Sequence, residues 1–462
     1  MDRKGIAKMK FRTRIATLIG RATQTILQKT SSGGTSLPGK LATRIQPNLL
    51  KELAKDYEVI LITGTNGKTV TTSLATSVLR QQYPHVLTNE TGSNLIQGII
   101  TAFIQDTKYR KVYANRPRIA LLEVDEASVR HVTEHIKPKA ILTTNLFLDQ
   151  VDRFSDVTVA YDYILEGIEK TPETVLIMNG DQPILADEKS TNPHVYFGFA
   201  NQNDETKLEI EAGAESDNCP KCGTKLAYFS NAYSNLGDYH CPNCAFSRPE
   251  LTYTVEEVLK MTPTSAKFII DGDIYETPHA GLYNIYNALA AYSIGHFMNV
   301  KTELIARGLR GSKTVFGRQE QIAVEDKDVQ INVIKNAVGL NQVIANLALE
   351  NDPFTFIYVI NNNPADGRDV SWISEGDFEK LEGMPIEHMF VSGIAKEQLT
   401  EHLLTLLKKP VKLDTLTDTK EIIQTIKTAQ TEKVYILASY TAMMEIREEL
   451  AEQGYVKERM QV

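Results

Sequence analysis

One stretch decides the fold of this 462-residue chain, and it reads Tyr57-Glu58-Val59-Ile60-Leu61-Ile62-Thr63-Gly64-Thr65-Asn66-Gly67-Lys68-Thr69. Its first six residues form a short run dominated by apolar, partly β-branched side chains, which predicts a buried parallel strand. Val70–Arg80 carries apolar residues at helical spacing and predicts a helix. A glycine turn between strand and helix is typical of a phosphate cradle, because glycines let backbone N–H groups approach the anion and the helix N-terminus adds positive potential.

The turn supplies the residues that a bound nucleotide triphosphate needs. The backbone from Gly64 to Gly67, through Thr65 and Asn66, would cradle the phosphates, Lys68 would reach the β- and γ-phosphates, and the Thr69 hydroxyl would hold Mg²⁺. The loop departs from the usual pattern in one place, because Ile62 stands where a glycine is expected. The alternative is a plain strand-to-helix turn with an exposed lysine. The context favours a site for ATP and Mg²⁺.

Length and charge limit the class of protein. A chain of this length accommodates about three domains. The net charge of −8 does not favour nucleic acid as a partner, and no segment is long and apolar enough to span a bilayer. We therefore expect a cytoplasmic protein. Arg3–Lys29 holds eight basic residues, so it predicts either a basic amphipathic helix at the inner face of the membrane or an exposed helix packed on the body.

The order of apolar runs predicts an α/β fold. Strand signals at 118–124, 140–143 and 174–178 alternate with helical stretches, which is typical of a doubly wound sheet. A second α/β unit begins near 316, with strand signals at 354–360, 388–391 and 433–438. We expect a basic helix and linker at 1–36, with a loop over 31–40. A central ATP-binding domain follows at 37–315, with an insertion at 205–250, and then a C-terminal Rossmann-like domain at 316–462.

All four cysteines lie within that insertion, as Cys219-Pro220-Lys221-Cys222 and Cys241-Pro242-Asn243-Cys244. Two Cys-x-x-Cys knuckles at this spacing are typical of a structural Zn²⁺ ribbon. Disulfides are the alternative, and a cytoplasmic chain disfavours them. Four thiolates close the coordination sphere, so we predict a structural zinc site. No cysteine then remains as a nucleophile, which excludes a cysteine-dependent glutaminase from this chain.

Acidic residues follow the strand at 118–122. Carboxylates at the carboxyl end of a parallel strand face the same crevice as the phosphate loop, which makes Glu123 the best candidate for a second Mg²⁺ ligand. Surface acids are the alternative. In the C-terminal unit, Asp366 and Asp369 lie in a glycine turn directly after the strand at 354–360, and charged residues there indicate either a site or an Asp-rich turn.

Gly64–Thr69 also resembles the ATP loop of the Mur ligases and folylpolyglutamate synthetases, which form amide bonds from a carboxylate and an amine. The resemblance extends to further positions and implies their roles. It implies Mg²⁺ ligands at Glu123, at Ser93 and, by ungapped counting, at Glu166, where an exposed helix glutamate is equally plausible. It implies adenine contacts at Asn284 and Asn287, with Asn284 as a helix cap the alternative. It implies phosphate contacts at Arg318 and Lys335.

Three features resemble one branch of that family, the MurT subunits of lipid II isoglutaminyl synthase: the string Asp366-Gly367-Arg368-Asp369-Val370-Ser371-Trp372, the four-cysteine insertion, and Asp149-Gln150 where other Mur ligases have Asp-His. The resemblance implies ATP-dependent amidation of the D-glutamate α-carboxyl of lipid II, in a heterodimer with a GatD-like glutaminase. Asp366 or Asp369 would orient ammonia or contact that partner. A stand-alone amino-acid ligase and a zinc-ribbon binding protein with a regulatory ATPase are the competing hypotheses.

Overall fold

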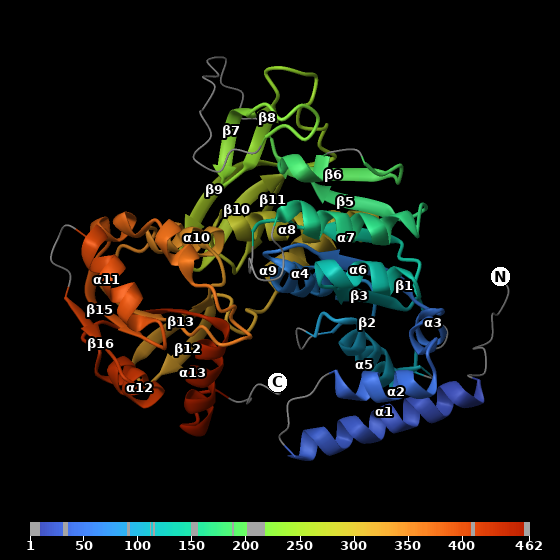
Figure 1. The fold of residues 1–462 in the computed structure, drawn as a ribbon, viewed down its shortest axis with the longest axis horizontal. Coiled ribbons are helices and arrows are strands. Elements are labelled where there is room, and N and C mark those ends of the chain that lie inside the picture. The colour runs from blue at the N-terminus through green and yellow to red at the C-terminus, as the bar shows by residue number, and fades with distance from the viewer. Residues whose placement is uncertain are drawn as a thin grey trace.

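The computed structural model describes residues 10–30 (without the side chains of 28–30), 36–89, 93–110, 112–113, 116–148, 156–186, 189–200, 218–407 and 412–456. Two mixed sheets organise these residues, and a small hairpin stands apart from both (Figure 1). Among the described helices, none has both the length and the apolar content to cross a membrane.

The larger sheet has nine strands in the order β11-β10-β9-β6-β5-β4-β1-β3-β2. Its bounds are β1 (Glu58–Thr63), β2 (Val86–Leu87), β3 (Ile119–Glu123), β4 (Ala140–Thr143), β5 (Val175–Asn179), β6 (His194–Phe199), β9 (Tyr253–Thr262), β10 (Ser265–Ile270) and β11 (Asp273–Thr277). The strands from β2 to β9 pair in parallel, and β9–β11 form an antiparallel meander. The predicted strand positions are confirmed to within one residue, whereas the meander had not been predicted.

Helices cover both faces of this sheet. The helices and 3₁₀ turns are α1 (Phe11–Thr30), α2 (Leu37–Ile45), α3 (Leu49–Ala54), α4 (Lys68–Arg80), α5 (Ile96–Asp106), η1 (Thr107–Tyr109), α6 (Glu126–Thr133), α7 (Val157–Glu169), η2 (Pro183–Ala186), α8 (Leu282–Phe297) and α9 (Thr302–Arg310). Alternate residues of β1 point to opposite faces: Ile60 and Ile62 pack with α4, α8 and α9, while Val59 and Leu61 pack with α2, α3 and α5–α7. A strand buried on both faces needs the continuous apolar run that the sequence has.

The smaller sheet has six strands in the order β12-β13-β17-β14-β15-β16, parallel except for β12–β13. Its elements are β12 (Glu320–Val324), β13 (Lys327–Val333), α10 (Ala337–Leu347), β14 (Phe354–Val359), η3 (Ser371–Glu375), η4 (Phe378–Gly383), β15 (Ile386–Ser392), α11 (Lys396–Leu406), β16 (Leu413–Thr415), α12 (Thr419–Thr428), β17 (Lys433–Ala438) and α13 (Tyr440–Glu452). Two apolar clusters fill its two faces, so this sheet is doubly wound too.

The hairpin consists of β7 (Ala227–Tyr233) and β8 (Leu236–His240), in the segment that carries the cysteines. Figure 1 shows it at the top of the view, above β6 and β9. Its own small core contains Tyr228, Tyr239 and Phe246. Arg248, which follows the second cysteine pair, pairs at 2.8 Å with the fully buried Asp181, and this ion pair ties the cysteine-bearing segment to the loop after β5.

The prediction of a loop over 31–40 is wrong for residues 37–40, which are helical, and residues 31–35 lie outside the described part. Helix α2 begins at Leu37, and Pro38 and Gly39 lie in its first turn. Proline is tolerated there, because the first helical N–H groups have no intrahelical partner. Gly39 permits close packing, since a Cβ at this position would lie 2.0 Å from the Gln97 carbonyl oxygen of α5.

Candidate active site

The phosphate loop is a tight turn that only glycine permits at two positions. Gly64 has φ +124° and Gly67 has φ +83°, both in the region that L-residues rarely adopt. A Cβ on Gly67 would lie 2.1 Å from Asn287 Oδ1 of α8, and a Cβ on Gly64 would lie 2.7 Å from the Asn145 carbonyl oxygen. Helix α4 follows with no side-chain cap, so its first-turn N–H groups at Lys68 and the half-buried Thr69 point to where an anion would sit.

The segment after β4 holds the loop in shape. Thr65 N donates to the Asn145 carbonyl oxygen at 2.8 Å, and Asn66 N donates to Asn145 Oδ1 at 2.9 Å. Thr144 Oγ1 donates to the Asn66 carbonyl at 2.8 Å. Asn145 opens the sequence motif that continues to Asp149-Gln150, and those last two residues lie outside the described part. The Asn145 side-chain amide therefore clamps the loop through Asn66, since it accepts from the Asn66 N–H and donates to the Asn66 carbonyl.

Lys68 lies under the loop in an ion pair that sequence reasoning missed. Its Nζ is 3.0 Å from Glu126 Oε1, and both side chains are about nine-tenths buried. Burial lowers the pKa of Lys68, but attraction to Glu126 and Glu123 outweighs it, so the net pKa is raised and the ammonium stays charged. Nζ also donates to the Gly64 carbonyl. Glu126 begins α6 at the carboxyl edge of the sheet, which is the signal that could have identified it.

Glu123 ends β3, beside Ile62 of β1 in the parallel register. It is 4% exposed, and among the described contacts its carboxylate takes no hydrogen bond. The Asn89 side chain holds its backbone, accepting from Glu123 N at 2.9 Å and donating to Glu123 O at 2.8 Å. Asn89 also donates to the Ser93 carbonyl, which brings Ser93 to the same edge. Thr91 and Gly92, which precede Ser93 in the segment between β2 and α5, lie outside the described part. A buried carboxylate is an oxygen donor that fits Mg²⁺, and the Ser93 hydroxyl as a further ligand stays a prediction.

Glu166 does not join this group in the structure. Its side chain is half exposed on α7 and pairs with Arg130 of α6 at 2.9 Å, and the Arg130 guanidinium also lies over the Tyr163 ring at 3.9 Å. The hydrogen bond that Arg130 donates to the Glu166 carboxylate raises the pKa of Arg130. The exposed-glutamate alternative therefore describes Glu166 better than the Mg²⁺ role. Ungapped counting cannot place the phase of a helix, and a Mg²⁺ role for Glu166 stays a prediction.

Asn284 and Asn287 lie on α8, behind the loop, and are almost fully buried. Asn284 donates to the Ala280 carbonyl at 2.8 Å, Asn287 donates to Asn284 Oδ1 at 3.0 Å, and Thr71 of α4 donates to Asn287 Oδ1 at 3.2 Å. Asn284 is not the helix cap, because Gly281 takes that position. In this arrangement the two amides join α8 to α4, and an adenine contact for them stays a prediction.

The hinge into the C-terminal unit is clamped to the start of α8. Gln319, a buried residue with φ +52°, accepts from Ala280 N at 2.8 Å and donates to the Tyr283 hydroxyl at 2.8 Å. Arg318 is half-buried beside it, and its charge is close enough to lower the pKa of Tyr283 somewhat, although burial raises that pKa overall. Arg318 is thus placed near α8, and the clamp formed by Gln319 was missed from the sequence.

The C-terminal unit touches the phosphate loop directly. Asn336 caps α10 by accepting from Gly339 N at 2.8 Å, and its Nδ2 donates to Asn66 Oδ1 of the loop at 3.2 Å. The half-buried Lys335 is the preceding residue. Asn336 is thus brought to the loop across 270 residues of sequence, and a phosphate contact for its neighbour Lys335 stays a prediction.

Asp366 and Asp369 differ in what they contact. Asp366 accepts from Thr441 N at the start of α13 at 2.7 Å and from Asn363 N at 3.1 Å, so it holds the turn against α13. Asp369 is exposed, and its hydrogen bond from Ser371 N lowers the pKa of its carboxyl group. Arg368 beside it is exposed too. Asp369 is therefore the carboxylate accessible from outside, while Asp366 shapes the loop.

The four cysteines converge on one point. Their Sγ atoms all lie within 4.8 Å of one another, with Cys219–Cys244 at 3.6 Å and Cys222–Cys241 at 3.4 Å. These separations far exceed an S–S bond and approach the spacing of about 3.8 Å that a tetrahedral Zn–S length of about 2.3 Å requires. Gly223 (φ +75°) turns the first knuckle. The donor set fits a structural zinc ion with no open position.

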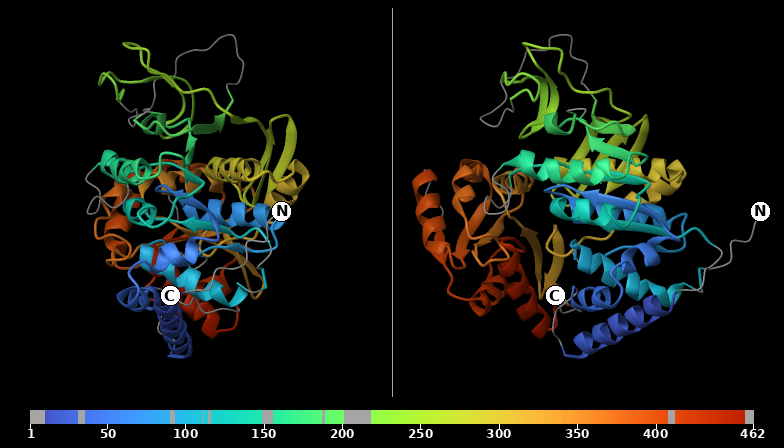
Figure 2. Two further views of the ribbon diagram at one scale, coloured as in Figure 1. Left: turned by 90° about the vertical axis from the view of Figure 1, so that its right-hand side faces the viewer. Right: turned by 45° about the vertical axis from the view of Figure 1, so that its right-hand side comes forward.

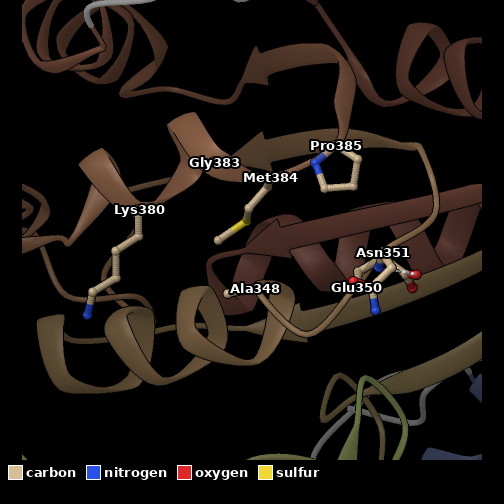
Figure 3. Close-up of a pocket in the computed structure, with 7 residues that line it drawn as sticks. All are labelled: Ala348, Glu350, Asn351, Lys380, Gly383, Met384 and Pro385. Atoms are coloured by element: carbon tan, nitrogen blue, oxygen red, sulfur yellow. Dashed lines mark hydrogen bonds between the residues drawn. The ribbon is translucent and has the colours of Figure 1, made fainter.

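A pocket on the C-terminal unit lies at the amino ends of β14 and β15, opposite the carboxyl ends where the Asp366 turn lies (Figure 3). Its lining comes from the segments that precede β14 and β15: Ala348, Glu350, Asn351, Lys380, Gly383, Met384 and Pro385. Ligand sites of parallel sheets lie beyond the carboxyl ends of the strands, where Asp366 and Asp369 are. Glu350 is committed to Lys433 and Tyr435, so this pocket has a structural explanation.

A P-loop between β1 and α4, contacted by a second α/β unit through Asn336, is the arrangement of a Mur-type ligase. Residues 62–295 match the family model of the Mur ligase middle domain, and residues 333–443 match that of the MurT ligase C-terminal. The chain belongs to the MurT family. It is 38% identical to the MurT subunit of lipid II isoglutaminyl synthase (glutamine-hydrolyzing) from Streptococcus pneumoniae, over 98% of this chain and all of that one.

Two further proteins mark the range of similarity. The subunit of the same name from Staphylococcus aureus is 33% identical over 79% of this chain and 82% of its own. The structure of a pseudomurein peptide ligase type C from Methanothermus fervidus superposes with a TM-score of 0.64 over 86% of this chain and 79% of the other, at 18% identity. At 18% identity, the likeness to the pseudomurein ligase shows a shared fold and nothing more.

Proposed function

We propose that this chain is the ATP-dependent synthetase subunit of a lipid II isoglutaminyl synthase. It would amidate the α-carboxyl of D-glutamate in lipid II to give D-isoglutamine, with ammonia from a separate GatD-like glutaminase bound as a heterodimer. The observation that supports the proposal most is the hydrogen bond between Asn66 of the predicted phosphate loop and Asn336, because it joins that loop to the C-terminal unit. The names of the relatives agree with this reaction.

The reaction has two steps. An oxygen of the D-glutamate carboxylate attacks the γ-phosphorus of ATP, and the bond to the β-phosphate oxygen breaks, which gives an acyl phosphate and ADP. The nitrogen of ammonia then attacks the acyl carbon, and inorganic phosphate leaves. Charge spreads over the γ-phosphate oxygens in the first step, so fixed donors at those oxygens lower the barrier. Lys68, the first-turn N–H groups of α4 and Lys335 would be those donors.

Mg²⁺ would neutralise phosphate charge, and Thr69, Glu123 and Ser93 are the oxygen donors available to hold it. Glu126 keeps Lys68 charged and in place before the nucleotide arrives, because their ion pair is buried. The four cysteines would hold a Zn²⁺ ion that stabilises the hairpin and takes no part in the reaction. Asp369, exposed in its turn, is the better candidate for the ammonia or partner contact.

The test is amidation by the purified chain with ATP and lipid II. We expect product with ammonium and none with glutamine, until a GatD-like glutaminase is added. Product from glutamine by the isolated chain would refute the need for a partner. Product with a free amino acid in place of ammonia would favour a stand-alone ligase. ATP hydrolysis with no amide product under all conditions would favour the regulatory-ATPase alternative.

A further inference from the structure

Helix α1 is packed with its apolar side outward. Its buried side consists of small residues: Thr13, Ala16, Thr17 and Gly20. A Cβ on Gly20 would lie 2.7 Å from Ile104 of α5, so α1 approaches the body as closely as a helix without large side chains can. This is the reverse of an ordinary surface helix, which buries its large apolar residues.

The outward side carries large apolar residues along one stripe. Phe11 and Leu18, seven residues apart, are 77% and 64% exposed, and Ile19 is 39% exposed. Residues at this spacing share a helix face. Among the described helices, no other carries more than one large exposed apolar side chain. Figures 1 and 2 show α1 as the outermost element at its end of the molecule, with α2 between it and the sheet.

Basic residues border this stripe. Arg14 and Arg21, also seven residues apart, lie exposed along one side of it, and Arg12 lies exposed along the other. The helix contains no acidic residue in its 20 positions, although the whole chain carries a net charge of −8. Charge of one sign therefore gathers around the only large exposed apolar helix face in the described residues.

We propose that the outward face of α1, formed by Phe11, Leu18 and Ile19 with Arg14 and Arg21, is a docking surface for an anionic lipid bilayer. An apolar stripe flanked by arginines lies in the interface plane, with apolar side chains at the acyl boundary and guanidinium groups at the headgroups. The Debye length of about 8 Å at physiological ionic strength means that the acidic residues of the remaining chain act on the membrane only weakly.

A second copy of the chain fits this face less well. A symmetric contact through α1 would place Arg14 and Arg21 of both copies in one interface without acidic partners on the helix. A bilayer that contains phosphatidylglycerol supplies the missing negative charge. The inference does not depend on the proposed reaction, because its test measures membrane binding and no turnover.

The experiment is co-sedimentation of the full chain with vesicles of phosphatidylglycerol and phosphatidylcholine in equal amounts, with pure phosphatidylcholine vesicles in parallel. We expect salt-sensitive binding to the anionic vesicles and little binding to the neutral ones. Leu18→Glu should weaken binding at least about tenfold, because it removes a leucine from the apolar contact. Arg14→Gln/Arg21→Gln should weaken it roughly twenty-five-fold, at about fivefold per arginine.

Matched controls exist on the same chain. Leu404 on α11 is 65% exposed, so Leu404→Glu makes the same change at the same exposure and should leave binding intact. Lys260 and Lys267 are exposed and face each other across β9 and β10. Lys260→Gln/Lys267→Gln therefore removes two positive charges away from α1 and is the control for the arginine pair. All variants should melt within a few degrees of the native chain.

Three results would overturn the inference. The first is that the native chain fails to sediment with anionic vesicles. The second is that Leu18→Glu binds vesicles as well as Leu404→Glu does. The third is that the native chain binds neutral and anionic vesicles equally. Light scattering identifies the competing occupant: if Leu18→Glu changes the oligomeric state of the chain and vesicle binding is absent, α1 is an interface between copies.

Discussion

Gly67 gives the sharpest test of how the phosphate loop is built. In Gly67→Ala the new methyl group would lie 2.1 Å from Asn287 Oδ1, at a residue with φ +83°. The left-handed conformation costs about 1–2 kcal/mol for a non-glycine residue. Asn287 must also move, which breaks its bonds with Thr71 at 3.2 Å and Asn284 at 3.0 Å, at about 1 kcal/mol each.

The expected loss is therefore about 3–4 kcal/mol, and a control separates its two parts. Gly272, in the turn between β10 and β11, has φ +81° and nothing within 4 Å of its missing Cβ. Gly272→Ala should thus cost only the conformational part, about 1–2 kcal/mol. Combining Gly67→Ala with Asn287→Ala should recover part of the steric loss, because the obstructing amide is gone.

The assay is thermal unfolding, read at the transition of the central unit, together with ATP affinity by calorimetry. At about 2–4 °C per kcal/mol for a domain of this size, we expect Tm to fall by roughly 10 °C for Gly67→Ala and by roughly 4 °C for Gly272→Ala. ATP binding should weaken only in the first variant. Equal shifts for the two variants, with ATP binding kept in both, would refute the role assigned to the contact between the loop and α8.

Further predictions follow from single contacts. Lys68→Met should lower ATP-dependent turnover by about 10²–10³-fold with the fold retained, and near-native turnover would remove the phosphate role of Lys68. The native chain should contain about one zinc by elemental analysis and lose it in Cys219→Ser; a zinc-free native chain would contradict the ribbon. Asp369→Asn should impair glutamine-dependent amidation with an unchanged Tm. Asp366→Asn should lower the free energy of unfolding by about 1–3 kcal/mol, and Tm with it, because charge-assisted hydrogen bonds are lost. Burial lowers the pKa of His279 from 6.5 to about 4, so the unfolded chain binds a proton that the folded chain does not, and stability falls below pH 6.5 by about 1.4 kcal/mol at pH 5.5. His279→Leu should remove that part of the pH dependence of Tm, and an unchanged slope would show that His279 does not titrate as described.

The sequence by itself determined the elements whose signals are local. The strand, glycine turn and helix from Tyr57 to Arg80 are legible because their residues are neighbours in the chain and each conformation has its own residue preference. The same holds for the cysteine pairs, whose spacing sets the ligand geometry of each knuckle. The MurT resemblance was equally readable, because it rests on short contiguous strings such as Asp366–Trp372.

Only the tertiary structure decided which side chains meet. It paired Lys68 with Glu126 as well as placing Glu123 nearby, joined Asn66 to Asn336, and left Glu166 on an outer helix face. The physical reason is that such contacts depend on sheet order and on the rotation of each helix about its axis. Both are set by packing over the whole core, where a single residue of phase moves a side chain by about 100°.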